Sequence, residues 1–359
     1  MSLNYAEQWN PELIPILIQN TISSPFITDK VRWLDAKTFH FTQMSVSGYK
    51  NHSRAGGWNS GTFSQTDVPY TLTHDRDVEF LVDIADVDET NATASIQNIS
   101  KVFEQTQVAP ETDALFFSKV AQAAEALTGY HSSTAAASYS TANVFGKLKT
   151  MLAAGKLRRY KANGSLIMYV TSEIMDLLEQ SSSFTRQIEL TQVAEGGMGI
   201  ETRVTDIDGV PVMEVIDDER FYDAFDWEGE DGGFAPRGGE YSKTSDVALD
   251  DSKTYYTYSN GVYTAVAEPN VSNISSYYEQ DVAGAHKINV LIACTETVKT
   301  VPKINSIYYF APGQHTKGDG YLYQNRALSD TFVFPNGKDG KADSIFVDVD
   351  STEILADPS

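Results

Sequence analysis

The chain has 359 residues, of which 41% are hydrophobic and 11% aromatic, so it can bury cores for two or three domains. Its 49 acidic residues against 27 Lys and Arg give a formal net charge of −22, which repels phosphate backbones and argues against sequence-specific nucleic-acid binding. The one cysteine, Cys294, excludes an internal disulfide framework, and its apolar surroundings INVLIAC predict an inert buried thiol.

The first 30 residues or so are expected to form an arm that cannot fold alone. A short apolar helix is predicted between Pro11 and Asn20, and it needs a surface to cover. That surface belongs either to a neighbouring subunit or to the chain's own domain. The apolar residues concerned are Leu13, Ile14, Ile16, Leu17 and Ile18.

The N-terminus lacks the basic opening of a signal peptide, and Glu7 and Glu12 interrupt its apolar residues. No apolar run in the sequence is long enough to cross a bilayer. We therefore expect the protein to be made in the cytosol.

A long exposed hairpin is expected next. Alternating apolar residues from Lys37 to Val46 predict a half-buried strand, and the alternation resumes at Tyr70 and Leu72. The Gly-, Ser- and Asn-rich chain from Ser47 to Asp67 would join the two strands. An ordinary mobile surface loop is the alternative interpretation.

Two helices are predicted after the acidic string DIADVDET. The first spans about Thr90–Thr106, where apolar residues recur at three- and four-residue spacing. The second has Pro110 in its first turn, acidic residues near the positive end of its dipole, and Gly129 as its stop.

Helix and strand patterns then alternate and predict a compact mixed α/β domain. Val144 to Leu152 carries a helical pattern that ends at Gly155, and the run SLIMYVT at 165–171 predicts a buried strand. The sequence RVTDIDGVPVMEVID predicts a hairpin whose turn lies at Asp208-Gly209.

The segment 226–283 changes character. Its opening is acidic and Gly-rich, its net charge is about −8, and the tyrosine-dense KTYYTYSNGVYTAV predicts a hairpin with a turn at Asn260-Gly261. We interpret it as a small β insertion on a surface. Beyond it, the runs KINVLIA, KINSIYYF, DTFVF and DSIFVDV predict four strands.

No catalytic motif is present: the sequence contains no nucleophile elbow, phosphate-binding loop, HExxH or CxxC pattern. Its six histidines show no ligand spacing, and the basic run KLRRYK at 156–161 is interpreted as a solvated helix end or as an intersubunit or DNA-facing patch. Two acidic clusters lack the order of a calcium loop, and we expect solvated or helix-start acids there: Asp83, Asp86, Asp88 and Glu89, and Asp348, Asp350 and Glu353. We assign no catalytic residue, no cofactor and no metal.

Two regions carry a resemblance to a known family. From Thr71 to Ala114 the chain joins an alternating strand, the string THDRDVEFLVDIADVDETN and a helix opening with APETDA, in that order. Near the C-terminus stands AHKINVLIACTETVKTVPKINSIYYFAPGQHTKGDGYLYQNRALSDTFVFPN. Outside 226–283, the chain resembles the major capsid proteins of tailed bacteriophages, which have the Hong Kong 97 type of capsid fold.

The resemblance implies an α+β fold with a defined order of parts. An N-terminal arm and first strand would occupy 1–46, the E-loop 47–72, and a peripheral domain with its spine helix 73–140. An axial domain would occupy 141–300 and carry the β-rich insertion 226–283. The C-terminal strands at 301–359 would return to the peripheral domain.

The implied function is structural and not enzymatic. Subunits would form pentamers and hexamers of an icosahedral shell in the virion, made in the host bacterial cytoplasm, without a membrane. The shell would enclose double-stranded DNA without sequence-specific binding, and its partners would be a portal and a separate scaffolding protein. An acidic wall would confine the polyanion without adhering to it.

Intersubunit contacts are expected from the arm and the E-loop, where large apolar side chains need cover from a neighbour. The candidates are Leu13, Ile16, Leu17, Arg54, Trp58 and Phe63. Covalent cross-linking of the kind some family members use is not assigned, although Lys50 lies near the loop. Two alternatives stay open: an encapsulin-like compartment that houses enzymes, and an acidic carbohydrate-binding or hydrolytic surface protein that uses the tyrosine-rich insertion.

Overall fold

The computed structural model describes residues 20–28, 33, 37–52, 56, 58–84, 96–181, 204–227, 233–246, 248–250, 252–259, 262–335 and 342–355. Within them the chain forms two compact units. Unit 1 takes the described residues up to Phe116 and those of Cys294–Ser344, and unit 2 takes those of Phe117–Ala293 and from Ile345 onward. No helix in the described ranges is long and apolar enough to cross a membrane.

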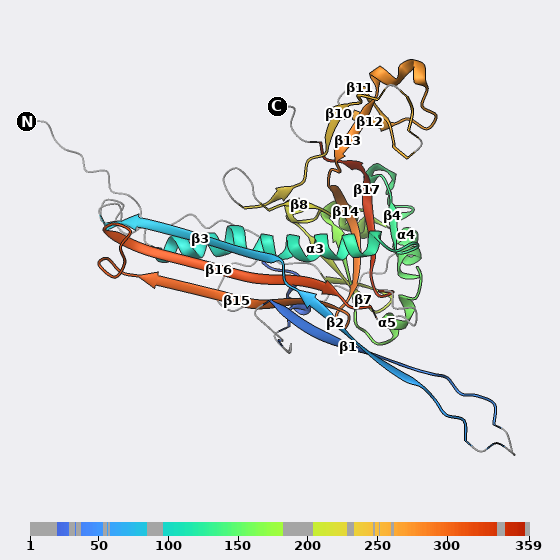
Figure 1. The fold of residues 1–359 in the computed structure, drawn as a ribbon, viewed down its shortest axis with the longest axis horizontal. Coiled ribbons are helices and arrows are strands. Elements are labelled where there is room, and N and C mark those ends of the chain that lie inside the picture. The colour runs from blue at the N-terminus through green and yellow to red at the C-terminus, as the bar shows by residue number, and fades with distance from the viewer. Residues whose placement is uncertain are drawn as a thin grey trace, which may run out of the picture. The chain divides into compact units, whose positions relative to one another are not determined.

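Unit 1 contains a three-stranded antiparallel sheet in the order β15-β16-β3 (Figure 1). Its strands are β3 (His74–Asp83), β15 (Val298–Phe310) and β16 (Gly320–Val333). The acidic string after Thr73 begins as a strand, in which the acids Asp75, Asp77 and Glu79 alternate with Arg76, Val78 and Phe80, and Asp75 pairs with Arg326 of β16. Sequence reasoning assigned only residues 330–334 to β16, since polar residues interrupt the apolar pattern earlier in the strand.

Strands β1 (Thr38–Val46) and β2 (Phe63–Thr71) pair antiparallel and form a separate two-stranded ribbon. The strand predicted over 37–46 is confirmed, whereas the second strand begins well before Tyr70. A two-stranded ribbon needs no buried face over most of its length, so the polar composition of 63–69 did not reveal it. The ribbon is anchored at one end, where Phe39 is buried beside its cross-strand partner Tyr70, 5.6 Å between ring centroids.

The core around Phe39 combines both sheets of unit 1. Phe332 and Phe334 of the chain after Thr331 meet the Phe39 ring edge-on, and Leu72, Val301 and Leu328 complete the buried cluster. Edge-to-face aromatic pairs add to the burial of apolar area. The base of the ribbon is therefore fixed while its far end is not packed on this core.

Helix α2 (Ile96–Phe103) and helix α3 (Ala109–Glu125) are joined by a π-helical turn over Glu104–Val108. The sequence predicted two separate helices, but the helical run is continuous across Pro110. Proline supplies no N–H to the turn before it, and the wider π turn accommodates this. The division between the two units falls within α3.

Asp113, in the first turns of α3, holds the segment that contains the short 3-10 helix Ser24–Phe26 against α3. Its carboxylate accepts hydrogen bonds from Ile22 N at 3.1 Å, Ser23 N at 3.0 Å and Ser23 Oγ at 2.6 Å. Phe26 is fully buried and packs on Phe116, with ring centroids 4.6 Å apart. The predicted helix at 11–20 falls almost wholly outside the described residues.

Unit 2 is built on a six-stranded mixed sheet in the order β4-β17-β14-β5-β7-β6. The strands are β4 (His131–Ser133), β5 (Leu166–Thr171), β6 (Val204–Ile207), β7 (Val210–Val215), β14 (His286–Cys294) and β17 (Phe346–Glu353). The helices are α4 (Val144–Leu152), α5 (Arg158–Ala162) and α6 (Ser172–Gln180). Strands β5 and β14 are buried along most of their length, as their continuous apolar sequences predict.

The hairpin turn at Asp208-Gly209 is confirmed, with positive φ angles of 56° and 82° at the two residues. The C-terminal strands divide between the two units: β16 pairs with β15 and β3 in unit 1, whereas β17 pairs with β14 and β4 in this sheet. Its apolar residues 345–347 are needed in the core of unit 2.

The insertion forms a four-stranded sheet in the order β10-β13-β11-β12. Its strands are β10 (Glu240–Lys243), β11 (Tyr256–Ser259), β12 (Val262–Ala265) and β13 (Tyr278–Val282), preceded by the short pair β8 (Phe225–Asp226) and β9 (Ala235–Pro236). Tyr255, Ile274 and Tyr277 form its own small core. The tyrosine hairpin is confirmed as β11 and β12, while Asn260-Gly261 lies outside the described residues.

Candidate intersubunit surfaces

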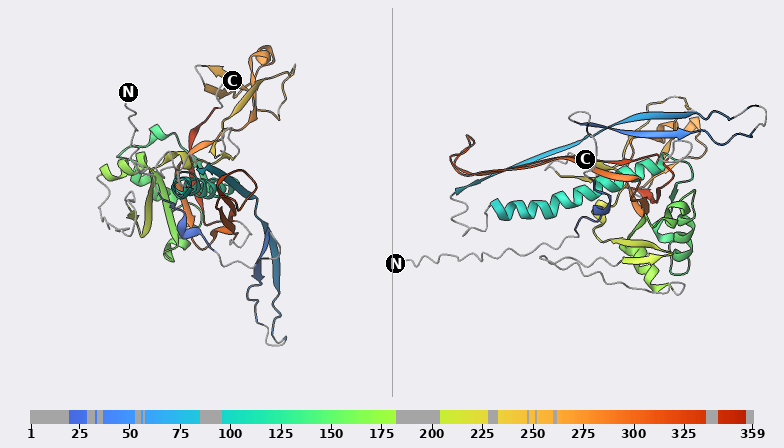
Figure 2. Two further views of the ribbon diagram at one scale, coloured as in Figure 1. Left: turned by 90° about the vertical axis from the view of Figure 1, so that its left-hand side faces the viewer. Right: turned by 90° about the horizontal axis from the view of Figure 1, so that it is seen from below.

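The β1–β2 ribbon exposes large apolar side chains at its far end. Trp58 is 96% exposed and Phe63 75% exposed, and Met44 and Val46 on the opposite strand are 66% and 74% exposed. Figure 2 shows the two strands running as a pair, and in the described part of the chain they form a sheet of two strands. Exposure of this kind removes no apolar area from water, so it stabilises nothing until another surface covers it.

Hydrogen bonds across the hairpin hold its two arms together beyond the strands. Ser47 N donates to Thr62 O at 2.8 Å, and Thr62 N donates to Ser47 Oγ at 2.9 Å. Lys50 Nζ donates to Ser60 O at 3.1 Å and Asn59 Nδ2 to Asn51 O at 2.8 Å. Polar contacts thus hold the described residues on the two sides of the loop together, and Trp58 and Phe63 take no part in these hydrogen bonds.

The candidate contacts named from the sequence fall into two groups. Trp58 and Phe63 lie on this exposed hairpin, close to the same end of it. The other four lie outside the described residues: Leu13, Ile16, Leu17 and Arg54.

Sequence reasoning missed a second exposed apolar set on the three-stranded sheet of unit 1. Ile307, Tyr308 and Tyr309 of β15 are each about half exposed, as is Leu81 of β3. The run SIYYF is the signal that could have found them. Successive residues of a strand point to opposite faces of the sheet, so a run of apolar residues places apolar side chains on both faces.

Ion pairs cross the same sheet beside these apolar side chains. Arg326 binds Asp75 through two hydrogen bonds of 3.0 and 2.9 Å, and Lys37 contacts Asp75 at 3.0 Å. The hydrogen bonds from Arg326 and then Lys37 lower the pKa of Asp75 to about 2. Lys317 contacts Glu79 at 2.6 Å in the same way. The Arg326–Asp75 pair joins β16 to β3 and helps to fix their register. Lys37, just before β1, and Lys317, before β16, connect further segments to β3.

The acidic residues near the C-terminus do not form a metal site. Asp348 is fully buried and accepts hydrogen bonds from four donors: Ser132 Oγ at 2.5 Å, Thr134 Oγ1 at 2.7 Å, Tyr139 OH at 2.6 Å and Asn289 Nδ2 at 3.0 Å. The expectation of a solvated acid is therefore wrong for Asp348, because these four groups replace water around its carboxylate. In the described part of the chain, no group of three or more His, Cys, Asp or Glu could hold a metal ion.

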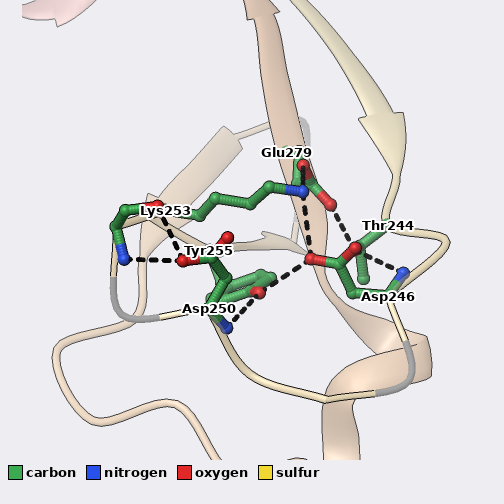
Figure 3. Close-up of polar contacts among 7 residues, drawn as sticks. Thr244, Asp246, Asp250, Lys253, Tyr255 and Glu279 are labelled. Carbon is green, nitrogen blue, oxygen red and sulfur yellow. Dashed lines mark hydrogen bonds and ion pairs between the residues drawn. The ribbon is translucent and has the colours of Figure 1, made fainter.

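A polar network closes one side of the insertion (Figure 3). Lys253 Nζ reaches Asp246 at 3.0 Å and Glu279 at 2.8 Å, and Tyr255 OH donates to Asp246 at 2.9 Å. The hydrogen bonds with Lys253 lower the pKa values of both carboxyls, assisted by Tyr255 at Asp246 and by Thr244 at Glu279. Lys253 is the one cation among these residues, and it links Asp246, in the chain after β10, to Glu279 of β13.

Five tyrosines of the four-stranded sheet contact one another. Tyr241 and Tyr263 stack at 4.0 Å between centroids with an interplanar angle of 7°, and further ring pairs at 4.7 to 6.3 Å join Tyr256, Tyr258 and Tyr278. Gln280 donates to both Tyr241 OH, at 2.9 Å, and Glu353, at 2.9 Å. Burial first, and then Glu353, raises the pKa of Tyr241. The rings pack on one another at the surface of the sheet, where Tyr258 stays 50% exposed.

The fold matches solved structures of phage capsids. A chain in the capsid structure of the cyanophage P-SCSP1u is 12% identical, with a TM-score of 0.58 over 98% of this chain and 94% of that chain. A chain in the asymmetric unit of the bacteriophage PhiM1 mature capsid is 11% identical, with a TM-score of 0.56 over 96% and 91%. A chain of Mycobacterium phage Che8 is 11% identical, with a TM-score of 0.53 over 97% and 98%.

No protein-family model and no curated protein sequence matches the chain. The similarity to the phage structures is therefore one of fold, at sequence identities of 11% to 12%. The α+β class and the capsid fold expected from the sequence are confirmed by it.

Proposed function

We propose that this chain is a major capsid protein, which self-assembles into pentamers and hexamers of an icosahedral shell enclosing double-stranded DNA. The observation that carries the proposal is the shared fold, which extends over nearly the whole of this chain and of chains in phage capsids. The role is structural, and the chain's own surfaces do the work by binding other copies of the chain.

The ribbon gives this proposal a physical mechanism. Trp58 and Phe63 are large apolar groups that the chain itself leaves in water. A neighbouring subunit that covers them gains the burial energy of both side chains, on the order of 2–3 kcal/mol for each. We therefore assign the β1–β2 hairpin to the E-loop, and Trp58 and Phe63 to its contact with the next subunit.

The remaining parts follow the same scheme. Unit 1, with its three-stranded sheet and the helical run into α3, is assigned to the peripheral domain, with α3 as the spine helix. Unit 2 is assigned to the axial domain, with the insertion as its outward decoration. A portal and a separate scaffolding protein are the proposed partners, and the virion is the proposed location. The acidic surface would confine DNA without sequence-specific contacts.

Trp58→Ala tests the mechanism. Shell yield, measured by light scattering and sedimentation, should fall, while the circular dichroism and urea midpoint of the unassembled subunit stay unchanged. Tyr258→Ala is the matched control, since Tyr258 is also an exposed aromatic residue but lies on the insertion. An equal loss of subunit stability in Trp58→Ala would instead place Trp58 in its own subunit's core.

Particle contents separate this proposal from a protein compartment that houses enzymes. Nuclease-protected DNA inside purified particles supports a phage shell, whereas protein cargo without DNA supports the encapsulin-like alternative.

A further inference from the structure

One stretch of unit 2 is basic in an otherwise acidic chain. Between Glu125 and Glu173 the sequence contains no Asp or Glu, although 49 acidic residues occur in the whole protein. The same stretch contains six cationic residues: Lys147, Lys149, Lys156, Arg158, Arg159 and Lys161. Positive charge is thus gathered in one place, against a net charge of −22 for the chain.

Three of these cations line a cavity of about 500 Å³ between α4, α5 and the β6–β7 turn. The lining residues are Lys149, Leu152, Ala153, Arg158, Lys161, Ala162 and Asp208. Since Asp208 is the one acidic residue among them, the lining has a positive net charge. The cavity is large enough to admit several side chains of a loop.

Asp208 positions the two lysines of the cavity. Its Oδ2 atom lies 3.4 Å from Lys149 Nζ and 3.3 Å from Lys161 Nζ. Desolvation acts to raise the pKa of Asp208, but the hydrogen bonds from Lys161 and Lys149 outweigh it and the pKa is lowered. Asp208 itself is held by the tight β6–β7 turn, so the ammonium groups are placed before any ligand arrives.

The ammonium groups of Lys149 and Lys161 have three N–H donors each, which is more than the single Asp208 carboxylate can accept. The side chains of Lys149 and Lys161 are still 45% and 32% exposed, and Arg158 is exposed beside them. The cavity is therefore suited to an oxyanion that enters from outside.

The shape of the cavity favours a protein carboxylate over a DNA duplex. A duplex presents about one charge per 1.7 Å along a convex rod, which a row of exposed cations matches better than a single pocket does. An acidic side chain of another protein can enter a pocket, and a second copy of this chain, with 49 acidic residues against 27 Lys and Arg, has acidic side chains in excess. We propose that this pocket receives an acidic side chain of a second copy of the chain in the assembled shell. The contact rests on the proposed function, because it forms only when copies assemble.

Neighbouring arginines on α5 provide the test. Arg158 lines the cavity and Arg159 does not, although both are exposed and belong to the same short helix. Arg158→Glu should raise the subunit concentration needed for assembly by about tenfold or more, as loss of an interfacial charge pair does. Arg159→Glu should change it less than about threefold. Light scattering over a concentration series at low salt measures both, and the difference should shrink in high salt.

Circular dichroism shows whether each variant folds, and Arg158→Gln is the milder variant, which should shift assembly in the same direction. Equal effects of Arg158→Glu and Arg159→Glu would overturn the proposal. So would an Arg158→Glu chain that assembles like the wild type but encloses less DNA, since the pocket would then contact nucleic acid. Failure of the wild-type chain to assemble at all would refute the proposed function, and the pocket contact with it.

Discussion

Removal of the Asp348 carboxylate should destabilise unit 2 more than almost any other single polar change. Asp348 is fully buried in β17, and its four donors come from β4, from the chain after β4 and from β14. The carboxylate thereby joins β17 to two segments that are far from it in the sequence, residues 132–139 and β14. Its burial is tolerated because every oxygen is paired.

The cost of Asp348→Ala follows from the groups left behind. Asn289 keeps one partner, since its amide also donates to Thr134 O at 2.8 Å. The hydroxyls of Ser132, Thr134 and Tyr139 each lose their acceptor. An unsatisfied buried donor costs about 1–3 kcal/mol, which applies to the buried Tyr139, whereas the half-buried Ser132 and Thr134 cost less because water can reach them. Relief of the buried charge offsets part of this. We expect a net loss of about 2–3 kcal/mol in the free energy of unfolding.

Urea unfolding of the unassembled subunit, followed by circular dichroism, measures this loss. Asp281→Ala is the control, because Asp281 is an exposed acid in strand β13, and its removal should cost less than about 0.5 kcal/mol. Tyr139→Phe should cost about 1–2 kcal/mol and should cost less when Asp348 is already Ala. A loss below about 1 kcal/mol for Asp348→Ala would refute the view that the four donors depend on this carboxylate.

Three further outcomes are expected. Burial first, and then the Asp223 carboxylate, raises the pKa of Glu125 to about 7. The folded chain therefore binds a proton more tightly than the unfolded chain does, and the free energy of unfolding should fall as pH rises from about 4.5 through 7. Glu125→Gln should flatten that part of a plot of melting temperature against pH, and an unchanged slope would contradict this expectation. Asp113→Ala should cost about 2–3 kcal/mol and speed amide exchange at 22–28, because three hydrogen bonds to that segment are lost; unchanged exchange would show that Phe26 packing alone holds it. Replacement of Trp227–Asp281 by a short Gly-Ser linker should still give shells. The ends of the insertion are close together, because Asp223 N donates a hydrogen bond to His286 O at 3.1 Å. Loss of assembly in a subunit that still folds would show that the insertion is an intersubunit contact.

Local sequence signals predicted the elements that depend on local physics. Pro110 and the acidic residues after it marked the start of α3, and Asp208-Gly209 marked a two-residue hairpin turn, because only such residues accept positive φ angles easily. Alternation around Phe39 predicted β1 because one face of that strand is buried there.

The features that the sequence did not predict depend on contacts between residues far apart in the chain. Strands β2 and β16 contain polar stretches whose stability comes from neighbouring strands, such as the Arg326–Asp75 pair between β16 and β3. Their partners are distant in the sequence, and no local pattern reveals them. The burial of Asp348 was missed for the same reason, since its donors lie more than 50 residues away. The sequence did predict an exposed Trp58, because a large apolar residue in a polar, Gly-rich segment is an unusual local pattern.

Negative-stain electron microscopy of the purified chain, expressed alone and together with a scaffolding protein, tests the proposed assembly into a capsid. We expect closed icosahedral shells, or pentameric and hexameric capsomers. Stable monomers under every assembly condition, in a chain that circular dichroism shows to be folded, would contradict it.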